Sequence, residues 1–130
     1  MIEYSTKKKV DIKQLQKLFA EAGWYDKKGD TARLNAMINN SQIIVTAWHA
    51  DRMVGFARCI TDNVFNGQIN NVVVDSNYRG KGIGKELVSR IINTNNQVTY
   101  VLRGDPENEG FYKRLGFVPE KLCLIYRRKK

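Results

Sequence analysis

The sequence predicts a mixed α+β fold in which strands and helices follow the order β-α-α-β-β-β-α-β-α-β. After a short first strand come two segments with helical periodicity, and β-branched apolar segments with strand character follow them. A Val-rich strand, a helix and another strand then form a strand–helix–strand unit. The 130 residues suffice for one domain with a real core, and we assign residues 1–130 to a single domain.

The N-terminal part is predicted to hold a short strand and two helices. Residues 2–6 form the strand, and Asp11 is a good N-cap for a helix that ends at Gly23. Asp30 or Thr31 can cap the second helix. The apolar faces are Ile12, Leu15, Leu18, Phe19 and Ala22 in the first helix, and Leu34, Met37 and Ile38 in the second.

Three strands are predicted in the middle of the chain. Residues 42–48 and 53–61 are apolar and β-branched, and the short polar connection 49–52 between them indicates a hairpin. Residues 69–75 contain Val72-Val73-Val74, which is typical of a buried central strand.

The last part of the chain is predicted to alternate between helix and strand. A helix over 82–93 is followed by a strand over 97–103 and a short helix over 107–115. Residues 117–128 are rich in strand formers on either side of Pro119, so we expect further strand structure there. The inward face of the first of these helices is Ile83, Leu87, Val88, Ile91 and Ile92.

The formal net charge of +9 is concentrated at the two ends of the sequence. Without Lys7–Lys9 and Arg127–Lys130, the chain holds 15 basic and 13 acidic residues, a net charge of +2. We interpret the ends as solvated charge, with steering of an anionic ligand as the alternative. No tract interleaves basic residues with aromatic ones, so we expect no dedicated nucleic-acid surface.

Several other classes of protein are excluded by composition. No apolar run has the roughly 18 residues of a membrane span, and the first residues lack the apolar region of a signal peptide. Cys59 and Cys123 stand singly, which fits a reducing cytoplasm better than a disulfide framework. With a single His and no clustered Cys, we expect no metal site.

The segment Arg79-Gly80-Lys81-Gly82-Ile83-Gly84, which we call the glycine turn, carries the chemistry. It joins a buried strand to a helix, so backbone N–H groups and the helix dipole converge there on an anion site. Arg79, Lys81 and Lys85 add positive charge, and a phosphate or pyrophosphate is the natural ligand. The spacing of its glycines and lysines fits neither a Walker A loop nor a dinucleotide-binding fingerprint nor the GxxG loop of KH domains.

The glycine turn resembles the acetyl-CoA-binding motif of the GCN5-related N-acetyltransferase (GNAT) superfamily, Arg/Gln-x-x-Gly-x-Gly/Ala. A second family signature is matched by residues 109–117, and the order of elements is similar along nearly the whole chain. The resemblance implies a central, mostly antiparallel, twisted sheet flanked by about four helices. It also implies transfer of acetyl from acetyl-CoA to a primary amine by direct attack in a ternary complex.

The resemblance assigns roles to individual residues. Val74 would present a backbone amide to the thioester carbonyl, and Tyr112 would be the general acid, with packing or coenzyme positioning as its alternative role. A phenol with a pKa of about 10 is a weaker acid than a thiol with a pKa of about 8.5, so it can protonate the leaving thiolate at a cost that the site can offset. The residues implied in acetyl-CoA binding are Val72, Val73, Val74, Arg79, Gly80, Lys81, Gly82, Ile83, Gly84, Lys85, Asp105, Asn108, Phe111 and Tyr112.

Asp105 departs from the family, in which many members have Asn near this position, and Asn108 is the alternative source of an amide. Trp24 and Tyr25 are candidates for the acceptor site, although core packing of Trp24 is an equal alternative. Phe65 and Asn66 could line the same cleft. Candidates for the general base are Glu21, Asp26, Asp62 and Glu109, whereas His49 is placed far from the glycine turn in a hairpin connection.

The expected partners are a small-molecule or peptide amine and no membrane. Two alternative functions stay open, a non-catalytic acyl-CoA-binding module and a lysine or N-terminal acetyltransferase directed at proteins or ribosomes. Residues 117–128 could also pair across a homodimer, since an exposed strand edge is a common route to association.

Overall fold

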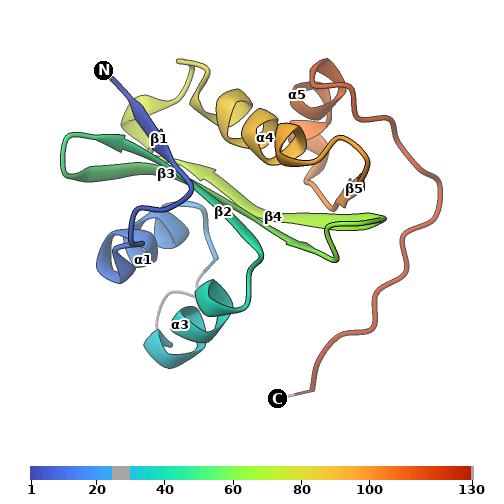
Figure 1. Ribbon diagram of the computed structural model, residues 1–130, viewed down its shortest axis with the longest axis horizontal. Helices are drawn as coiled ribbons and strands as arrows, with labels where there is room; N and C mark the ends of the chain where they lie inside the picture. Colours follow the sequence, from blue (N-terminus) through green and yellow to red (C-terminus); the bar gives the residue numbers. More distant parts are fainter. Residues whose placement is uncertain (25–29, 130) are drawn as a thin grey trace.

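The computed structural model describes residues 1–24 and 30–129, which form one five-stranded sheet with helices on both faces (Figure 1). The first four strands are antiparallel neighbours, and the last runs parallel to the fourth. In sheet order the strands are β1 (Glu3–Ser5), β2 (Ile43–His49), β3 (Arg52–Thr61), β4 (Asn66–Val74) and β5 (Thr99–Leu102). The predicted α+β class and mostly antiparallel sheet are confirmed.

Helices α1 (Ile12–Glu21) and α3 (Thr31–Asn39) cover one face of the sheet. Their starts are fixed as predicted, because a carboxylate oxygen of Asp11 accepts the Gln14 N–H at 3.1 Å and one of Asp30 accepts the Arg33 N–H at 3.0 Å. The core on this face consists of Leu15, Leu18, Phe19, Leu34, Trp48, Met53, Phe56 and Val73.

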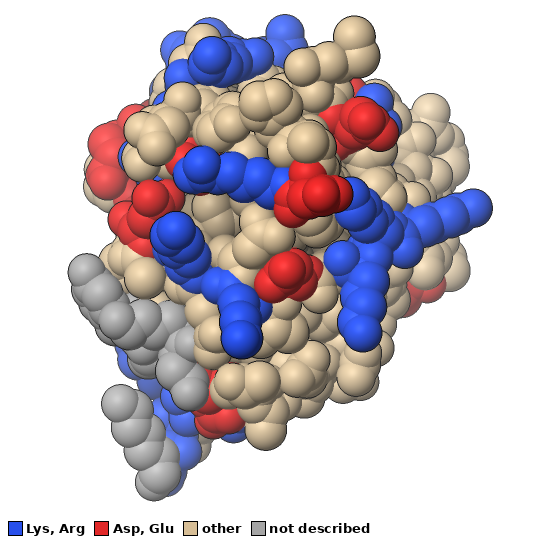
Figure 2. Space-filling view, turned by 90° about the vertical axis from the view of Figure 1, so that its left-hand side faces the viewer, with Lys and Arg blue, Asp and Glu red and all other residues tan. Residues whose placement is uncertain are grey.

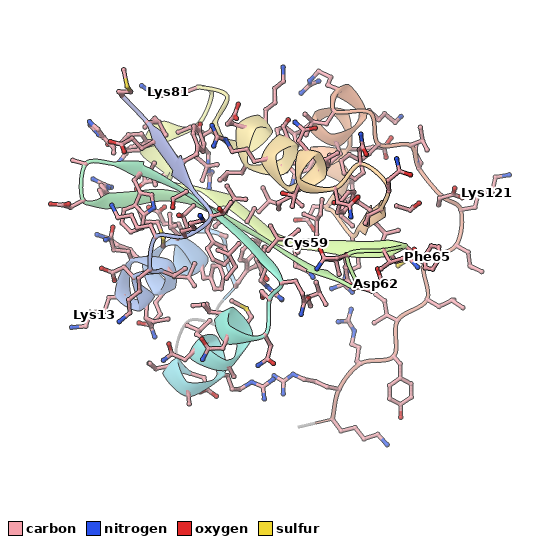
Figure 3. The ribbon with its side chains drawn as sticks, in the orientation of Figure 1. Lys13, Cys59, Asp62, Phe65, Lys81 and Lys121 are labelled. Atoms are coloured by element: carbon pink, nitrogen blue, oxygen red, sulfur yellow. The ribbon has the colours of Figure 1, made fainter. Side chains whose placement is uncertain are left out.

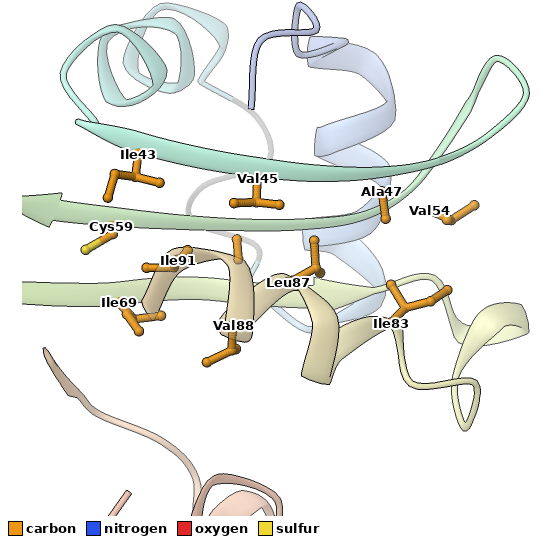
Figure 4. Packing of buried hydrophobic residues seen from close by; sticks show 11 residues of the cluster. Ile43, Val45, Ala47, Val54, Cys59, Ile69, Ile83, Leu87, Val88 and Ile91 are labelled. Atoms are coloured by element: carbon orange, nitrogen blue, oxygen red, sulfur yellow. The ribbon is translucent and has the colours of Figure 1, made fainter. Parts of the chain in front are cut away.

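Helices α4 (Ile83–Thr94) and α5 (Glu109–Arg114) lie on the other face (Figure 1). Figure 4 shows the cluster beneath α4, to which the helix contributes Ile83, Leu87, Val88 and Ile91. Gly55 lets this helix approach closely, since a Cβ there would lie 3.1 Å from both Ile83 Cγ2 and Leu87 Cδ1. Packing on β3 therefore holds the start of α4 near the end of β4.

The strand structure predicted for residues 117–128 is wrong. The Phe117 N–H still binds the Tyr112 carbonyl at 3.1 Å, but residues 118–129, which we call the C-terminal arm, are all exposed and run out of the domain as extended chain (Figure 1). A strand needs a neighbour for its N–H and C=O groups, and the arm pairs with none of the strands in the described part of the chain. Other boundaries differ less: β4 begins at Asn66 rather than 69, and a 3₁₀ turn (Pro106–Asn108) precedes α5.

The surface carries both signs of charge. On the face drawn in Figure 2, Lys and Arg side chains are interspersed with Asp and Glu instead of forming a continuous basic tract. Of the helices in the described ranges, none is both long and apolar enough to cross a membrane.

Asp75 anchors the end of β4 to the start of β3. The residue is 5% exposed. Its carboxylate accepts the Asn77 N–H at 2.9 Å and pairs with the Arg52 guanidinium at 2.7 Å, while its own N–H donates to the Val54 carbonyl at 2.8 Å. Burial raises the pKa of the Asp75 carboxyl, but the Asn77 N–H and the Arg52 cation together outweigh burial and lower it. The ionised carboxylate thus stabilises the fold.

The ion pair and hydrogen bond of Asp75 should make a pH-dependent contribution to stability. Asp75→Asn should lower the free energy of unfolding by about 1–3 kcal/mol at neutral pH, because the partners of a buried carboxylate are left unsatisfied. The folded pKa lies below the ordinary 3.8, so the contribution is complete above pH 3.8 and is lost as the pH falls through the folded pKa. Urea unfolding of the wild type and of Asp75→Asn should show a difference in the free energy of unfolding, and this difference should narrow below pH 3.8. A difference that stays constant down to about pH 2 would contradict the stabilising role of the ionised carboxylate.

Candidate active site

A bulge in β4 separates its last residues from β5. β4 and β5 pair only from Asn66 with Thr99 to Ile69 with Leu102, so residues 70–74 form an open edge of β4. Phe56 faces Val73 and Arg58 faces Asn70, which leaves two residues of β4 opposite Ala57 alone. Such a bulge bends a strand and increases its local twist.

Asn71 forms the bulge. Its φ of 54° lies in the left-handed region, which Asn tolerates better than most residues, and its Oδ1 accepts the Arg58 Nε–H at 2.7 Å. Arg58 is half-buried, and burial lowers its pKa. The bulge is therefore held by a specific hydrogen bond as well as by backbone geometry.

The backbone of Val74 faces the open edge. The hydrogen bond from Asp75 N–H to the Val54 carbonyl makes the neighbouring Gly55–Val74 pair a non-hydrogen-bonded one in the antiparallel ladder. The Val74 N–H and C=O therefore point away from β3. The carbonyl accepts the Arg79 Nε–H at 3.2 Å, which ties the strand end to the glycine turn and leaves the N–H directed at the open edge.

The glycine turn has the backbone that its sequence requires. Gly80 and Gly82 have φ values of 78° and 82°, and a Cβ built at either would meet no atom within 4 Å. These glycines are needed for their backbone conformation, and the space above them is open to a ligand. Gly82 is the N-cap of α4 and offers no side-chain cap, so the first N–H groups of the helix are available to an anion.

Three cations surround the turn. Arg79, Lys81 and Lys85 are exposed, and none of them forms an ion pair with a residue in the described part of the chain. Figure 3 shows Lys81 at the tip of the turn. Ile83, by contrast, is 2% exposed with its side chain in the core, so only its backbone can contact a ligand.

The turn, the end of β4 and α5 meet at Gly84. A Cβ at this position would lie 3.3 Å from Phe111 Cζ and 3.7 Å from Val74 Cγ2. The structure thus brings together the predicted turn, the predicted strand and the predicted helix that carries Tyr112. The contact requires a small residue, which explains the last glycine of the motif.

Tyr112 is held between two aromatic rings. Its ring centroid lies 4.9 Å from that of Phe111 and 5.7 Å from that of Phe117, both edge-on. Burial, and then the charge of Asp105, raise the pKa of the Tyr112 phenol above its ordinary 10.0, so the hydroxyl keeps its proton at neutral pH. Asp105 itself begins the 3₁₀ turn before α5, where its carbonyl accepts the Asn108 N–H at 2.9 Å.

The three predicted acceptor residues that the structure describes are not gathered at this site. The Trp24 ring packs edge-on against Phe19 at 5.2 Å beside the α1–α3 core, so the core-packing alternative describes it better. Phe65, 71% exposed, and Asn66 lie at the start of β4, at the opposite end of the strand from the glycine turn, as Figure 3 shows for Phe65 and Lys81. Tyr25 lies outside the described residues.

The candidate bases are mostly engaged in local structure. The Asp62 carboxylate accepts the Val64 and Phe65 N–H groups at 2.8 Å, and these bonds, the Val64 bond foremost, lower its pKa. Glu109 pairs with Lys113 at 2.7 Å. Asp26 lies outside the described residues.

Glu21, a candidate base, and His49 both reach the segment that follows β4. Glu21 accepts the Ser76 hydroxyl at 3.3 Å and lines a pocket of about 240 Å³ on the α1 side, together with Gln14, Lys17, Arg52 and Asp75. His49, expected far from the turn, has its Nδ1 2.7 Å from the Tyr78 hydroxyl. The pairing of β3 with β4 and the Arg52–Asp75 ion pair bring the hairpin connection there, and no local pattern in the sequence signals it.

Comparisons with known proteins agree with this geometry. Residues 39–119 match the family described as Acetyltransferase (GNAT) domain. An uncharacterized N-acetyltransferase, ycf52, from Pyropia yezoensis is 31% identical over 126 residues, which span 92% of this chain and 71% of the relative. A histone acetyltransferase, TAP1, from Glycine max is 32% identical over 89% of this chain, which spans only 55% of that relative.

The fold is also shared with solved structures. A GNAT-family acetyltransferase from Streptococcus pneumoniae superposes with a TM-score of 0.81 over the whole of both chains at 21% sequence identity. The bulged strand, the glycine turn and the family match lead to one conclusion: this chain belongs to the GNAT family of acetyltransferases.

Proposed function

We propose that this protein transfers the acetyl group of acetyl-CoA to the nitrogen of a primary amine. The observation that carries the proposal is the Val74 N–H, which faces the open edge of β4 next to the glycine turn. A hydrogen-bond donor fixed at that place can polarise a carbonyl and stabilise the negative charge that develops on its oxygen. One such preorganised donor is worth on the order of 3 kcal/mol.

The described residues fit the coenzyme. The turn offers free amides, open space above Gly80 and Gly82, and the cations Arg79, Lys81 and Lys85 for a pyrophosphate. The open edge of β4 offers the backbone of Val72–Val74 to the amide groups of a pantetheine arm. Phe111 borders this edge at Gly84, with Asp105 and Asn108 at the start of the same helix.

Residues of this chain can polarise the thioester carbonyl and protonate the leaving thiolate. When bound, acetyl-CoA supplies an activated acetyl thioester. Val74 presents its N–H to the carbonyl oxygen, and Tyr112 holds a proton on its Oη that it can give to the departing thiolate. The raised pKa of Tyr112 keeps this proton in place across the neutral range.

Two other functions remain candidates for the same site. An acyl-CoA-binding module without turnover would need no acid, so the presence of Tyr112 favours an enzyme. A protein-directed acetyltransferase is favoured by the similarity to TAP1, which carries the name of a histone acetyltransferase. An assay of thiol release from acetyl-CoA, with a panel of small amines and of lysine and N-terminal peptides, separates the three. Release with an amine supports the enzyme, and tight binding without release with any amine supports the module.

The turn generates a prediction about charge. Gly82→Asp should weaken coenzyme A binding by about tenfold or more, because it places a carboxylate where phosphate oxygens are expected. Gly82→Asn is the matched control, since it imposes the same positive-φ strain and nearly the same volume without charge. Circular dichroism should first show that both variants are folded. Calorimetric titration with coenzyme A should then give the highest affinity for the wild type, a lower one for Gly82→Asn and the lowest for Gly82→Asp. Equal affinities for Asn and Asp at this position would place the phosphates elsewhere.

Tyr112 generates a prediction about rate. Tyr112→Phe keeps the ring between Phe111 and Phe117 and removes only the hydroxyl, so binding of coenzyme A and Tm should change little. With a substrate for which chemistry limits turnover, kcat should fall by roughly 10²–10⁴-fold. A fall of less than about threefold would make Tyr112 a positioning residue and leave protonation of the sulfur to water.

A further inference from the structure

Arg58, on β3, is a half-buried cation that forms no ion pair with any described residue. Its Nε–H donates to Asn71 Oδ1 at 2.7 Å, and Nη1 donates to the Ser41 hydroxyl at 3.4 Å. A guanidinium has five N–H donors, so the others lack an acceptor among the described residues. No described side-chain nitrogen is both fully buried and without a partner, so these donors reach the surface. The guanidinium is therefore accessible to a ligand.

The structural role of Arg58 does not require its charge. A neutral N–H donor would be enough to hold the Asn71 amide at the bulge, whereas a partly buried cation costs free energy unless an anion accompanies it. Burial is what lowers the pKa of Arg58, and no described carboxylate opposes this effect. A half-buried charge without a described counter-charge indicates an anionic partner that comes from outside the chain.

A second arginine lies in the same row of the sheet. Asn70 of β4 is the direct cross-strand partner of Arg58. β4 and β5 last pair one residue before Asn70, so Arg103 follows beside Asn70 where the two strands part. The sequence neighbours of these three residues lie in the cluster beneath α4 or pack against it: Cys59, Ile69 and Leu102. Alternation along the strands therefore places Arg58, Asn70 and Arg103 together on the other face of the sheet.

This row, which we call the arginine row, is open to a ligand. Arg103 is exposed, Asn70 and Arg58 are half-buried, and no ion pair with a described residue neutralises either arginine. Helix α4 and its glycine turn lie on the opposite face. A coenzyme bound at the turn therefore leaves the arginine row free for the second substrate.

The distance from the arginine row to the proposed reaction centre limits the size of that substrate. Asn71, which holds Arg58, precedes Val74 by three residues, or roughly 10 Å at the rise of a strand. An amine and a carboxylate joined by about four methylene groups, with a hydrogen bond of about 3 Å at the acid end, have this length. The planar fork of a guanidinium matches the two oxygens of a carboxylate.

We propose that the acceptor is an amino acid whose amine and carboxylate are several bonds apart, and that Arg58 and Arg103 bind its carboxylate. This inference rests on the proposed function and adds a substrate class to it. The amine loses a proton to water and forms a C–N bond with the acetyl carbon. The C–S bond breaks, and the departing thiolate takes the proton of Tyr112. The arginine row takes no part in these steps and determines which amine is held at the edge of β4.

Three amines that differ only in the group at the far end of the same methylene chain test the proposal. δ-Aminovalerate ends in a carboxylate, pentylamine in a methyl group and putrescine in a second amine. Thiol release by the wild type should give a kcat/KM for δ-aminovalerate at least about tenfold above that for pentylamine, because a charge-assisted pair is gained. Putrescine should be the poorest substrate, since its second cation meets two others.

Substitutions in the arginine row should remove this preference. Arg58→Gln and Arg103→Gln should each lower the ratio of kcat/KM for δ-aminovalerate to that for pentylamine by about tenfold, and Arg58→Lys should keep part of it. The ratio also corrects for any general loss in Arg58→Gln, whose bulge is altered. Arg103 is exposed and has no described partner, so its variant should fold normally. Arg33→Gln, on the exposed face of α3, removes the same charge and should leave the ratio unchanged.

The possible failures are distinguishable. Equal or better use of an amine without a carboxylate would overturn the proposal and leave the acetyltransferase function intact. A preference for δ-aminovalerate that survives both Gln variants would also overturn it, because the carboxylate would then bind elsewhere. No thiol release with these amines or with any amine of the panel above would contradict the proposed function, and this inference with it.

Discussion

The site depends on one distortion of the sheet, the bulge at Asn71. Two residues of β4 occupy the space of one opposite Ala57, and the Arg58 side chain fixes the amide of Asn71 there. Beyond this point β4 has β3 on one side and no strand on the other, so the Val74 N–H is directed at an open edge instead of a ladder partner. A regular strand at this place would pair with β5 and leave no donor free.

The rest of the molecule positions other groups around that edge. Gly55 allows α4 to sit directly on β3, which brings the N-terminus of the helix and its glycine turn to the end of β4. Asp75 locks the strand end to Arg52, and Gly84 admits Phe111 and with it the helix that carries Tyr112. Each of these contacts joins residues that are distant in the sequence and close in space. Together they determine the geometry at which an anion, a thioester and a proton donor could meet.

Local sequence patterns were enough to predict most of this arrangement. The caps at Asp11 and Asp30, the hairpin and the strand–turn–helix unit at the glycine turn all rest on neighbouring residues. The pattern missed what depends on distant pairing: the approach of His49 to Tyr78 and the separation of Phe65 from the turn along β4. It assigned strand structure to 117–128 because the residues there favour strands. A strand also needs a neighbouring strand to pair with its backbone, and residue preference alone does not show whether one is present. The Asn70-Asn71 pair within an apolar strand was the available signal for the bulge.

Binding of coenzyme A by the open edge of β4 and the glycine turn together is the step on which the proposed chemistry rests. Backbone amide NMR during a titration with coenzyme A tests it most directly, because it reads the proposed donors themselves. We expect the amides of Val74, Gly80 and Gly82 to shift together and to saturate with one dissociation constant. This binding mode would be contradicted if these amides stayed unmoved while those around Gln14 and Lys17, at the pocket on the α1 side, responded to the ligand.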